Sequence, residues 1–314
     1  MKNANKVSRS FQHMILLCGC LLIYYSVSAR QHKPTESGYI AQKTQGIDSD
    51  YVLIFNSYSE SAPWCRSLVD STVMDLIKLS PQTMTVTQNL NSGLLRDEKA
   101  LAQLRQQVDV SYHDKPRMII YIGSTSWPFL HETIEKKWGK VPSIIFSDID
   151  YTGPIANLLR KTPIAPALRI PYDKIVKEYE GALSVVYMPI YLRQSLALMH
   201  QLTPPMTELC FISDTRWISA QMRADMAAIT KTDFPELKVR YLISADMSTL
   251  DLLDSLQHYG QETGVLFFSW LKQSQVGDSF VNDSHFRIII SKSARQPLFV
   301  LNDNEVNTDS DVLG

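Results

Sequence analysis

The chain has 314 residues, of which 45% are hydrophobic and 20% are charged, which is the composition of an ordinary globular protein of about two domains. Its 31 Lys and Arg almost balance its 32 Asp and Glu, so it lacks the basic excess of a general nucleic-acid binder. Beyond the N-terminal 30 residues, no segment approaches the run of about 18 apolar residues that a membrane-spanning helix needs.

Residues 1–29 have the layout of an export signal. Basic residues come first, the uncharged run from Met14 to Tyr25 follows, and small residues precede a cleavage position after Ala29. An uncleaved anchor remains an alternative, as does a lipoprotein, because Cys18 and Cys20 half-match a lipidation motif. In each case we expect a periplasmic or other extracytoplasmic protein. Residues 30–49 are polar and aperiodic, and are expected to be a linker.

From residue 50 to about residue 150, short apolar runs rich in strand formers alternate with helical patterns. Met118–Ile122 reads MIIYI and is typical of a fully buried strand. Leu101, Leu104 and Val108 are spaced as on one face of a helix. The expected strands are 51–55, 84–87, 118–122 and 143–146, and the expected helices are 61–77, 94–108 and 129–138.

Four prolines between 154 and 171 interrupt this pattern, which then restarts. Strands are expected at 209–212, 239–243, 265–268 and 298–301, and helices around 192–199, 222–229 and 250–253. Continuous apolar strands that alternate with helices predict parallel sheets covered on both faces. The sequence therefore predicts the α/β class, with two doubly wound Rossmann-like lobes at 50–175 and 176–304.

The residues that follow the predicted strands are polar or aromatic at almost every position. In open α/β sheets, ligands bind beyond the carboxyl ends of the strands, so these loops are candidates for a small-ligand cleft. The chain has no phosphate-binding loop, no G-x-G-x-x-G and no G-x-S-x-G, and its histidines show no metal-ligand spacing. We therefore expect no catalytic residues, no metal and no cofactor.

Two cysteines, Cys65 and Cys210, lie in the part expected to fold. Two cysteines do not make a disulfide framework, and these two fall in different predicted lobes. They are expected to be separate buried thiols.

Several segments together resemble a known family: VLIFNSYSESAPWCRSLVDS (52–71), CFISDTRWISAQMR (210–223), TGVLFFSW (263–270) and PLFVLND (297–303). They are similar to exported sensor domains of the type I periplasmic-binding-protein class. They resemble in particular the N-terminal sensor regions of hybrid two-component histidine kinases from Bacteroidetes-like bacteria, which are similar to ABC-transporter solute-binding proteins. The resemblance covers about residues 50–304. In that class the chain then returns to lobe one, so we expect 305–314 to be a truncated crossover with this return missing.

The resemblance implies a hinged, two-lobed binder that closes on a small molecule. Carried across by position, the cleft would be lined by residues of both lobes: Ser57, Tyr58, Trp64, Gly123, Ser124, Asp148, Asp214, Arg216, Trp217, Ser269, Trp270 and Asp303. Asp214 and Arg216 stand where a helix is expected to start and would hold a polar or charged ligand group. As a surface cap, Asp214 is expected to contribute only ~1 kcal/mol to stability.

The leading functional hypothesis is a ligand-sensing domain of a hybrid histidine kinase, with the kinase part absent from this chain. Its partners would be a small-molecule ligand and a membrane-bound kinase or a missing C-terminal region, and no nucleic acid. A homodimer is one of the open alternatives for its assembly. A free solute-binding protein of an ABC importer is the second hypothesis, and an exported hydrolase with a triad in the cleft is the third.

Overall fold

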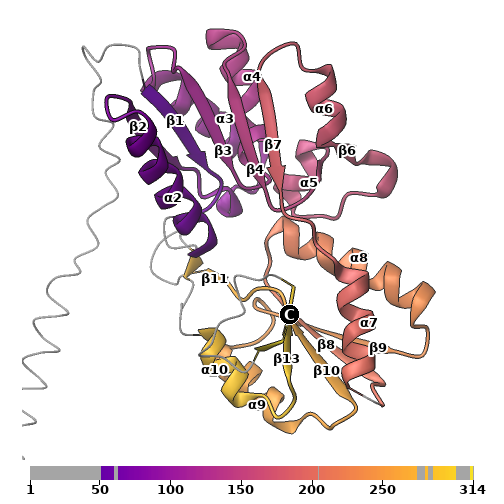
Figure 1. The fold of residues 1–314 in the computed structure, drawn as a ribbon. Helices are drawn as coiled ribbons and strands as arrows, with labels where there is room; N and C mark the ends of the chain where they lie inside the picture. Colours follow the sequence, from indigo (N-terminus) through magenta and orange to yellow (C-terminus); the bar gives the residue numbers. More distant parts are fainter. Residues whose placement is uncertain are drawn as a thin grey trace, which may run out of the picture. The chain divides into compact units, whose positions relative to one another are not determined.

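Two five-stranded sheets, each flanked by helices, organise the described part of the chain (Figure 1). The computed structural model describes residues 51–59, 63–203, 205–273, 280–281, 286–301 and 312–313. The predicted signal at 1–29 and the predicted linker at 30–49 lie outside the described residues. No helix in the described ranges is both long and apolar enough to cross a bilayer.

The first sheet has the strand order β2-β1-β3-β4-β7, and every neighbouring pair is parallel. Its strands are β1 (Tyr51–Asn56), β2 (Met84–Asn89), β3 (Met118–Ile122), β4 (Ser143–Ser147) and β7 (Leu183–Tyr187). We call this sheet with its helices lobe one.

The second sheet has the order β14-β13-β10-β8-β9 and is also parallel throughout. Its strands are β8 (Glu208–Ser213), β9 (Lys238–Ile243), β10 (Thr263–Phe267), β13 (Leu298–Val300) and β14 (Val312–Leu313). We call this sheet with its helices lobe two. In each lobe the second strand in the chain lies at one edge and the first lies next to it, so both sheets are doubly wound. The predicted α/β class is confirmed.

The helices and short elements connect these strands. The helices are α2 (Pro63–Leu79), α3 (Glu98–Ser111), α4 (Ser126–Trp138), α5 (Ile155–Arg160), α6 (Tyr172–Glu178), α7 (Leu192–Leu202), α8 (Trp217–Asp233), α9 (Thr249–His258) and α10 (Phe286–Ser293). Two 3-10 turns, η1 (Ser92–Leu94) and η2 (Pro166–Leu168), and two small antiparallel pairs, β5 (Tyr151–Thr152) with β6 (Ile170–Pro171) and β11 (Lys272–Gln273) with β12 (Phe280–Val281), complete the set.

Strand β1 shows why the strands are apolar without interruption. Successive side chains point to opposite faces of a sheet. Val52 and Ile54 pack with α2, whereas Leu53 and Phe55 pack with residues of α3 and α4. Both faces of β1 are therefore shielded from water. A polar side chain on either face would lack hydrogen-bond partners.

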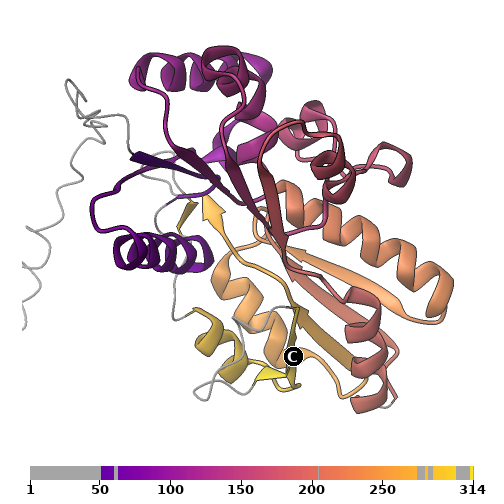
Figure 2. The ribbon, with the colours of Figure 1, turned by 45° about the horizontal axis from the view of Figure 1, so that its top comes forward.

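Lobe two is built in the same way, with its sheet between α7 and α8 on one face and α9 and α10 on the other (Figure 2). Leu209 and Phe211 of β8 join the core beside α7 and α8, while Cys210 and Ile212 join the core beside α9. A capping box starts α9, in which Ser248 and Asp251 satisfy each other's backbone N–H groups.

Helix α8 also contacts lobe one. The Ile164 N–H donates to Oε1 of Gln221 on α8 at 2.7 Å, and the Arg169 guanidinium lies 2.5 Å from the Asp225 carboxylate. One continuous apolar cluster includes residues of both lobes, among them Trp127 of α4 and Trp217 of α8. The lobes therefore meet through packed and hydrogen-bonded side chains.

Three boundaries differ from the sequence prediction. Strand β7 pairs with β4, so lobe one extends past residue 175 to Tyr187, and the segment rich in proline carries α5, the β5–β6 pair and α6. Strand β14 pairs with β13, so the segment predicted as a crossover, 305–314, contributes a strand to lobe two. The helix predicted from Leu94 begins at Glu98 instead, because the Asp97 carboxylate caps it by accepting the Ala100 N–H.

The prediction of two separate thiols is confirmed, since Cys65 and Cys210 are both free and buried. Burial raises the pKa of Cys65 well above its usual range and raises the pKa of Cys210 to about 11. Both groups are therefore protonated near neutral pH, where a thiol is a poor nucleophile.

We expect both thiols to resist alkylation by iodoacetamide in the folded protein at pH 8 and to react once it is unfolded. Between the ordinary thiol pKa of 9.0 and about 11, the unfolded chain releases a proton from Cys210 that the folded chain retains, so stability should fall as pH rises. Peptide mass spectrometry of Cys65 and Cys210 before and after denaturation measures the labelling. Rapid labelling of either thiol in the native state would contradict their burial.

Candidate functional site

Tyr58 and Asp148 connect the ends of β1 and β4, the two strands of the first sheet that flank β3. Tyr58 follows β1, Asp148 follows β4, and the Tyr58 hydroxyl donates to Oδ2 of Asp148 at 2.6 Å. Burial is the largest cause that raises the pKa of Tyr58, and the nearby Asp148 raises it further. The phenol is therefore a protonated donor, and it holds the carboxylate at the carboxyl edge of the sheet.

Arg216 of lobe two reaches this pair. Its guanidinium carbon lies 5.2 Å from the centre of the Tyr58 ring, which is cation–π distance. Its Nε lies 2.8 Å from Oδ2 of Asp214. Burial alone lowers the pKa of Arg216, but Asp214, Tyr58 and Asp148 together outweigh it and raise this pKa above its ordinary value. The charge is thus retained between two carboxylates.

Asp214 is the anchor of this arrangement. Its side chain is fully buried and accepts hydrogen bonds from the Arg216 N–H at 2.9 Å, from Nε of Arg216 and from the Ser219 hydroxyl at 2.6 Å. Ser219 in turn lies 3.2 Å from the Ser269 hydroxyl. The expectation that Asp214 is a surface cap is wrong, because it is half of a buried ion pair.

Gly123 allows β1 and β3 to end close together. It has a φ of +88°, and a Cβ there would lie 2.7 Å from Cβ and Oγ of Ser57 and 2.9 Å from the Tyr58 ring. The Ser57 hydroxyl accepts the Ser126 N–H at 2.8 Å, at the start of α4. Only glycine fits this position, which fixes the loop that carries Ser124.

Four of the predicted residues help to line a cavity of only about 20 Å³, which has room for about one water molecule. It is lined from both lobes, by Tyr58, Ser92, Gly93, Ser124, Thr125, Leu158, Lys161, Arg216, Trp217 and Ile218. Oγ of Ser124 and Nε1 of Trp217 are buried without a hydrogen-bond partner among the described residues. The side chains around this cavity pack against one another and leave no room for a ligand larger than about one water molecule.

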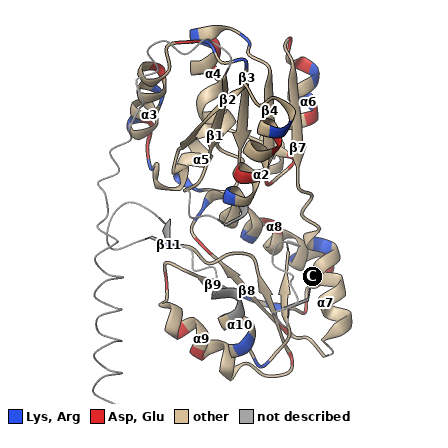
Figure 3. Cartoon of the chain, turned by 60° about the vertical axis from the view of Figure 1, so that its left-hand side comes forward, with Lys and Arg blue, Asp and Glu red and all other residues tan. Residues whose placement is uncertain are grey.

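A much wider cleft of about 610 Å³ lies beside this cavity, and Lys161 lines both. The lining comprises Arg96, Leu159, Arg160, Lys161, Thr215, Ser244, Ala245, Leu271 and Lys272. Thr215, Ser244 and Leu271 follow β8, β9 and β10, so the cleft opens at the carboxyl edge of the second sheet. Figure 3 shows blue segments of Lys and Arg between α5 and this sheet.

None of the ten predicted residues whose side chains are described lines the wide cleft. Eight of them lie around the contact between the lobes: Ser57, Tyr58, Gly123, Ser124, Asp148, Asp214, Arg216 and Trp217. Ser269 joins this contact through Ser219. Trp270 instead packs in the core of lobe two and donates to the Thr249 hydroxyl at 3.2 Å. The side chain of Trp64 and all of Asp303 lie outside the described residues.

Replacing Tyr58 by Phe removes the hydroxyl that donates to Asp148 but keeps the ring beneath Arg216. We expect Tyr58→Phe to lower the free energy of unfolding by about 1–2 kcal/mol, because a carboxylate loses a short hydrogen bond. Urea unfolding measures it, with Tyr187→Phe as the control, since Tyr187 is 37% exposed. Equal stability of the two variants would contradict a role for the Tyr58–Asp148 bond.

No protein-family model and no curated protein matches this chain. Solved structures do resemble it. A conserved domain protein from Vibrio cholerae has a TM-score of 0.48 and 8% identity, covering 82% of this chain and 76% of that one. A domain from Streptococcus pneumoniae in complex with L-Trp has a TM-score of 0.46 and 11% identity, covering 82% and 76%.

A third similar structure is a carbohydrate transporter solute-binding protein from Agrobacterium radiobacter, in complex with D-arabinose. Its TM-score is 0.44 and its identity 11%, covering 83% of this chain and 79% of that one. The neighbours have a type I periplasmic-binding-protein-like fold. Likenesses at this level concern the fold alone and carry no information about what this chain binds.

Proposed function

We propose that this chain is an extracytoplasmic small-ligand-binding domain that acts as the sensor of a two-component histidine kinase. The observation that carries the binding proposal is the cleft of about 610 Å³, which is lined from both lobes and opens where strands of the second sheet end. A volume of this size suits a small molecule, and strand ends are where α/β folds bind ligands.

Contacts between the lobes supply a means of signalling. Tyr58 and Asp148 of lobe one meet Arg216 of lobe two, and Ile164 and Gln221 form a second contact. A ligand that touched both lobes would favour the arrangement in which these contacts form, and this shift in population is what a kinase could read. The export signal predicted at 1–29 supports an extracytoplasmic place for the domain.

The first test is a thermal-shift screen of the purified chain against small metabolites. A compound at a hundred times its dissociation constant should stabilise the folded state by about 2.7 kcal/mol, which shifts the melting temperature by several degrees. No stabilisation by any sugar, amino acid, nucleotide or organic acid would count against a binding function.

A solute-binding protein of an ABC importer uses the same fold and the same kind of cleft, and is the second candidate function. The genes that lie beside this one would distinguish the two candidate functions. A neighbouring kinase reading frame would support the sensor, and neighbouring permease genes would support the importer. The hydrolase hypothesis has less support, because no histidine is among the described residues that line either cavity.

A further inference from the structure

Helix α2 has apolar residues on most of its sides, and little of it is buried. Among its described side chains only that of Cys65 is buried, whereas α8, which is also 17 residues long, buries eight. The side chains of α2 that pack against the first sheet remain partly exposed: Leu68, Val69, Val73 and Leu76. On its other sides Met74, Ile77 and Leu79 are 54%, 46% and 84% exposed. A helix that is apolar on so many sides is normally covered by a neighbour.

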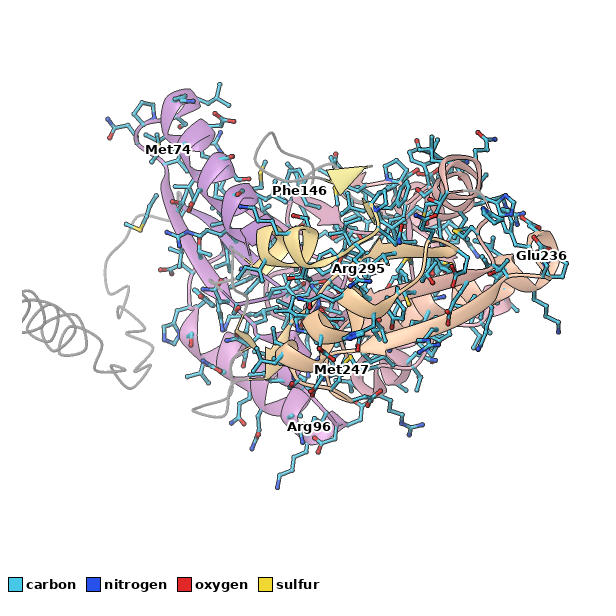
Figure 4. The ribbon with its side chains drawn as sticks, turned by 90° about the horizontal axis from the view of Figure 1, so that it is seen from below. Met74, Arg96, Phe146, Glu236, Met247 and Arg295 are labelled. Atoms are coloured by element: carbon cyan, nitrogen blue, oxygen red, sulfur yellow. The ribbon has the colours of Figure 1, made fainter. Side chains whose placement is uncertain are left out.

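Met74 lies at the centre of the exposed side of α2. Residues four positions apart follow one another along one side of a helix, so four residues form a single stripe: Arg66, Asp70, Met74 and Lys78. All four side chains are exposed, and Ile77 lies next to Met74 on the same side. Figure 4 shows Met74 labelled on α2, at the outside of lobe one. The stripe is therefore a helix surface that a second protein chain can reach.

The charges of this stripe are paired within α2. Arg66 lies 3.7 Å from Asp70, and Lys78 lies 3.1 Å from Asp75. All four side chains are 66% or 67% exposed, so these pairs contribute little to the stability of the helix. Negative charge precedes Met74 at Asp70, and positive charge follows it at Lys78, four residues away on each side. Opposite charges at equal distances from a central residue are what a helix needs to match an antiparallel copy of itself.

A second α2 that runs antiparallel to the first, with a two-fold axis at Met74, brings opposite charges together. Asp70 of each copy then lies opposite Lys78 of the other, because both residues are four positions from the axis. The pairs within each helix are kept, so Arg66 and Asp70 of one copy form a row of alternating sign with Lys78 and Asp75 of the other. A shift of the axis by two residues would instead place Arg66 opposite Lys78, and these like charges would repel.

We propose that α2 forms the interface of a homodimer, in which two copies of the helix pack antiparallel and Met74 of each lies at the two-fold axis. Contact of Met74 and Ile77 with the other copy would remove apolar surface from water, and the alternating charges would fix the register. Helix α2 is ~26 Å long and ~10 Å across, so this contact alone is smaller than the ~800 Å² per partner of a stable complex. We therefore expect monomer and dimer in equilibrium. The inference concerns assembly and does not depend on the ligand of the wide cleft.

The test is sedimentation velocity of the purified full chain over a range of concentrations. We expect the average mass to rise with concentration from that of the monomer, 35.7 kDa, towards twice this value. Met74→Glu places two negative charges at the axis and should weaken dimerisation about tenfold or more. The matched control is Leu250→Glu, which makes the same kind of change at a leucine of α9 that is 76% exposed. Every variant keeps the same N-terminus, so association through residues 1–29 would not separate them.

Exchange of the two facing charges tests the register. Asp70→Lys and Lys78→Asp each place like charges opposite one another, twice in the dimer, and should weaken dimerisation about tenfold. The double variant Asp70→Lys/Lys78→Asp brings opposite charges together again and should recover most of this loss. Lys174→Glu and Glu178→Lys are the controls, because they change a pair on α6 whose side chains are 63% and 67% exposed. Circular dichroism checks that each variant is folded.

Three results would overturn the proposal: a monomer at every concentration up to about 0.3 mM, equal dimerisation of the Met74→Glu and Leu250→Glu variants, or a double exchange that dimerises no better than the single changes. A dimer that forms but does not respond to changes on α2 would mean that another surface is the interface. None of these measurements uses a ligand, so their failure would leave the proposed binding function in place.

Discussion

Replacing Asp214 by Ala is expected to lower the free energy of unfolding by about 3–5 kcal/mol. The substitution leaves the Arg216 guanidinium, whose side chain is 16% exposed, beside a cavity with no counter-charge from Asp214. It also removes the acceptor for the Arg216 and Ser219 donors. Urea unfolding followed by circular dichroism measures the loss.

The control is Asp75→Ala, which breaks an ion pair with Lys78 whose side chains are 66% and 67% exposed. Surface pairs of this kind contribute about 0–1 kcal/mol, so the control should change little. The double variant Asp214→Ala/Arg216→Ala should be less destabilised than the sum of the single variants, because the uncompensated charge is gone. Strict additivity, or a loss no larger than in the control, would contradict the buried ion pair.

Gly123→Ala is expected to be the second most damaging change. The left-handed backbone costs a residue with a side chain about 1–2 kcal/mol, and forcing a methyl group into packed atoms adds about 1–3 kcal/mol. The total loss of stability should be about 2–5 kcal/mol. The methyl group would lie 2.7 Å from Ser57 and 2.9 Å from Tyr58.

Gly139→Ala separates these two costs. Gly139 has a φ of +68° and a ψ of −162°, a conformation almost confined to glycine, and a Cβ there meets nothing within 4 Å. Its variant therefore loses stability through backbone strain and not through overlap of atoms. Thermal or urea unfolding of both variants gives the difference, which we expect to be at least about 1 kcal/mol. If Gly123→Ala and Gly139→Ala lost the same free energy of unfolding, the close approach of the ends of β1 and β3 at Gly123 would be contradicted.

The central strands of both sheets could be predicted because each is buried on both faces. The runs at β1 and β3 admit no polar residue at their centres, and they therefore stand out from the sequence. Strand β7 was missed, because it lies at the edge of the first sheet and is half exposed, so its residues LSVVY carry a mixed pattern.

The sequence indicated the residues that form the contact between the lobes, but not their burial or the ion pair that they make. Tyr58, Asp148 and Asp214 each follow a predicted strand, and Arg216 was added through the family resemblance. The structure brings all four together. That Asp214 is buried could not be predicted, since burial of a carboxylate depends on a partner supplied by the tertiary structure. The family resemblance placed these residues in a ligand cleft, whereas the wide cleft has a different lining.

The basic residues that line the wide cleft could not be predicted from the sequence. Arg96 and Lys161 are 65 positions apart in the numbering, and each reads as an ordinary surface cation at a helix end. Their proximity depends on how η1 and α5 lie above the first sheet. The left-handed backbone of Lys161 also carries no sequence signature, because lysine does not favour it.

The most direct test of the account is hydrogen–deuterium exchange with the compound that raises the melting temperature most in the metabolite screen. A ligand held between the lobes should protect backbone amides in both of them together, in peptides that contain residues 92–97 and 158–162 of lobe one and residues 244–246 of lobe two. Protection confined to one lobe, or located away from these segments, would contradict a ligand cleft lined from both.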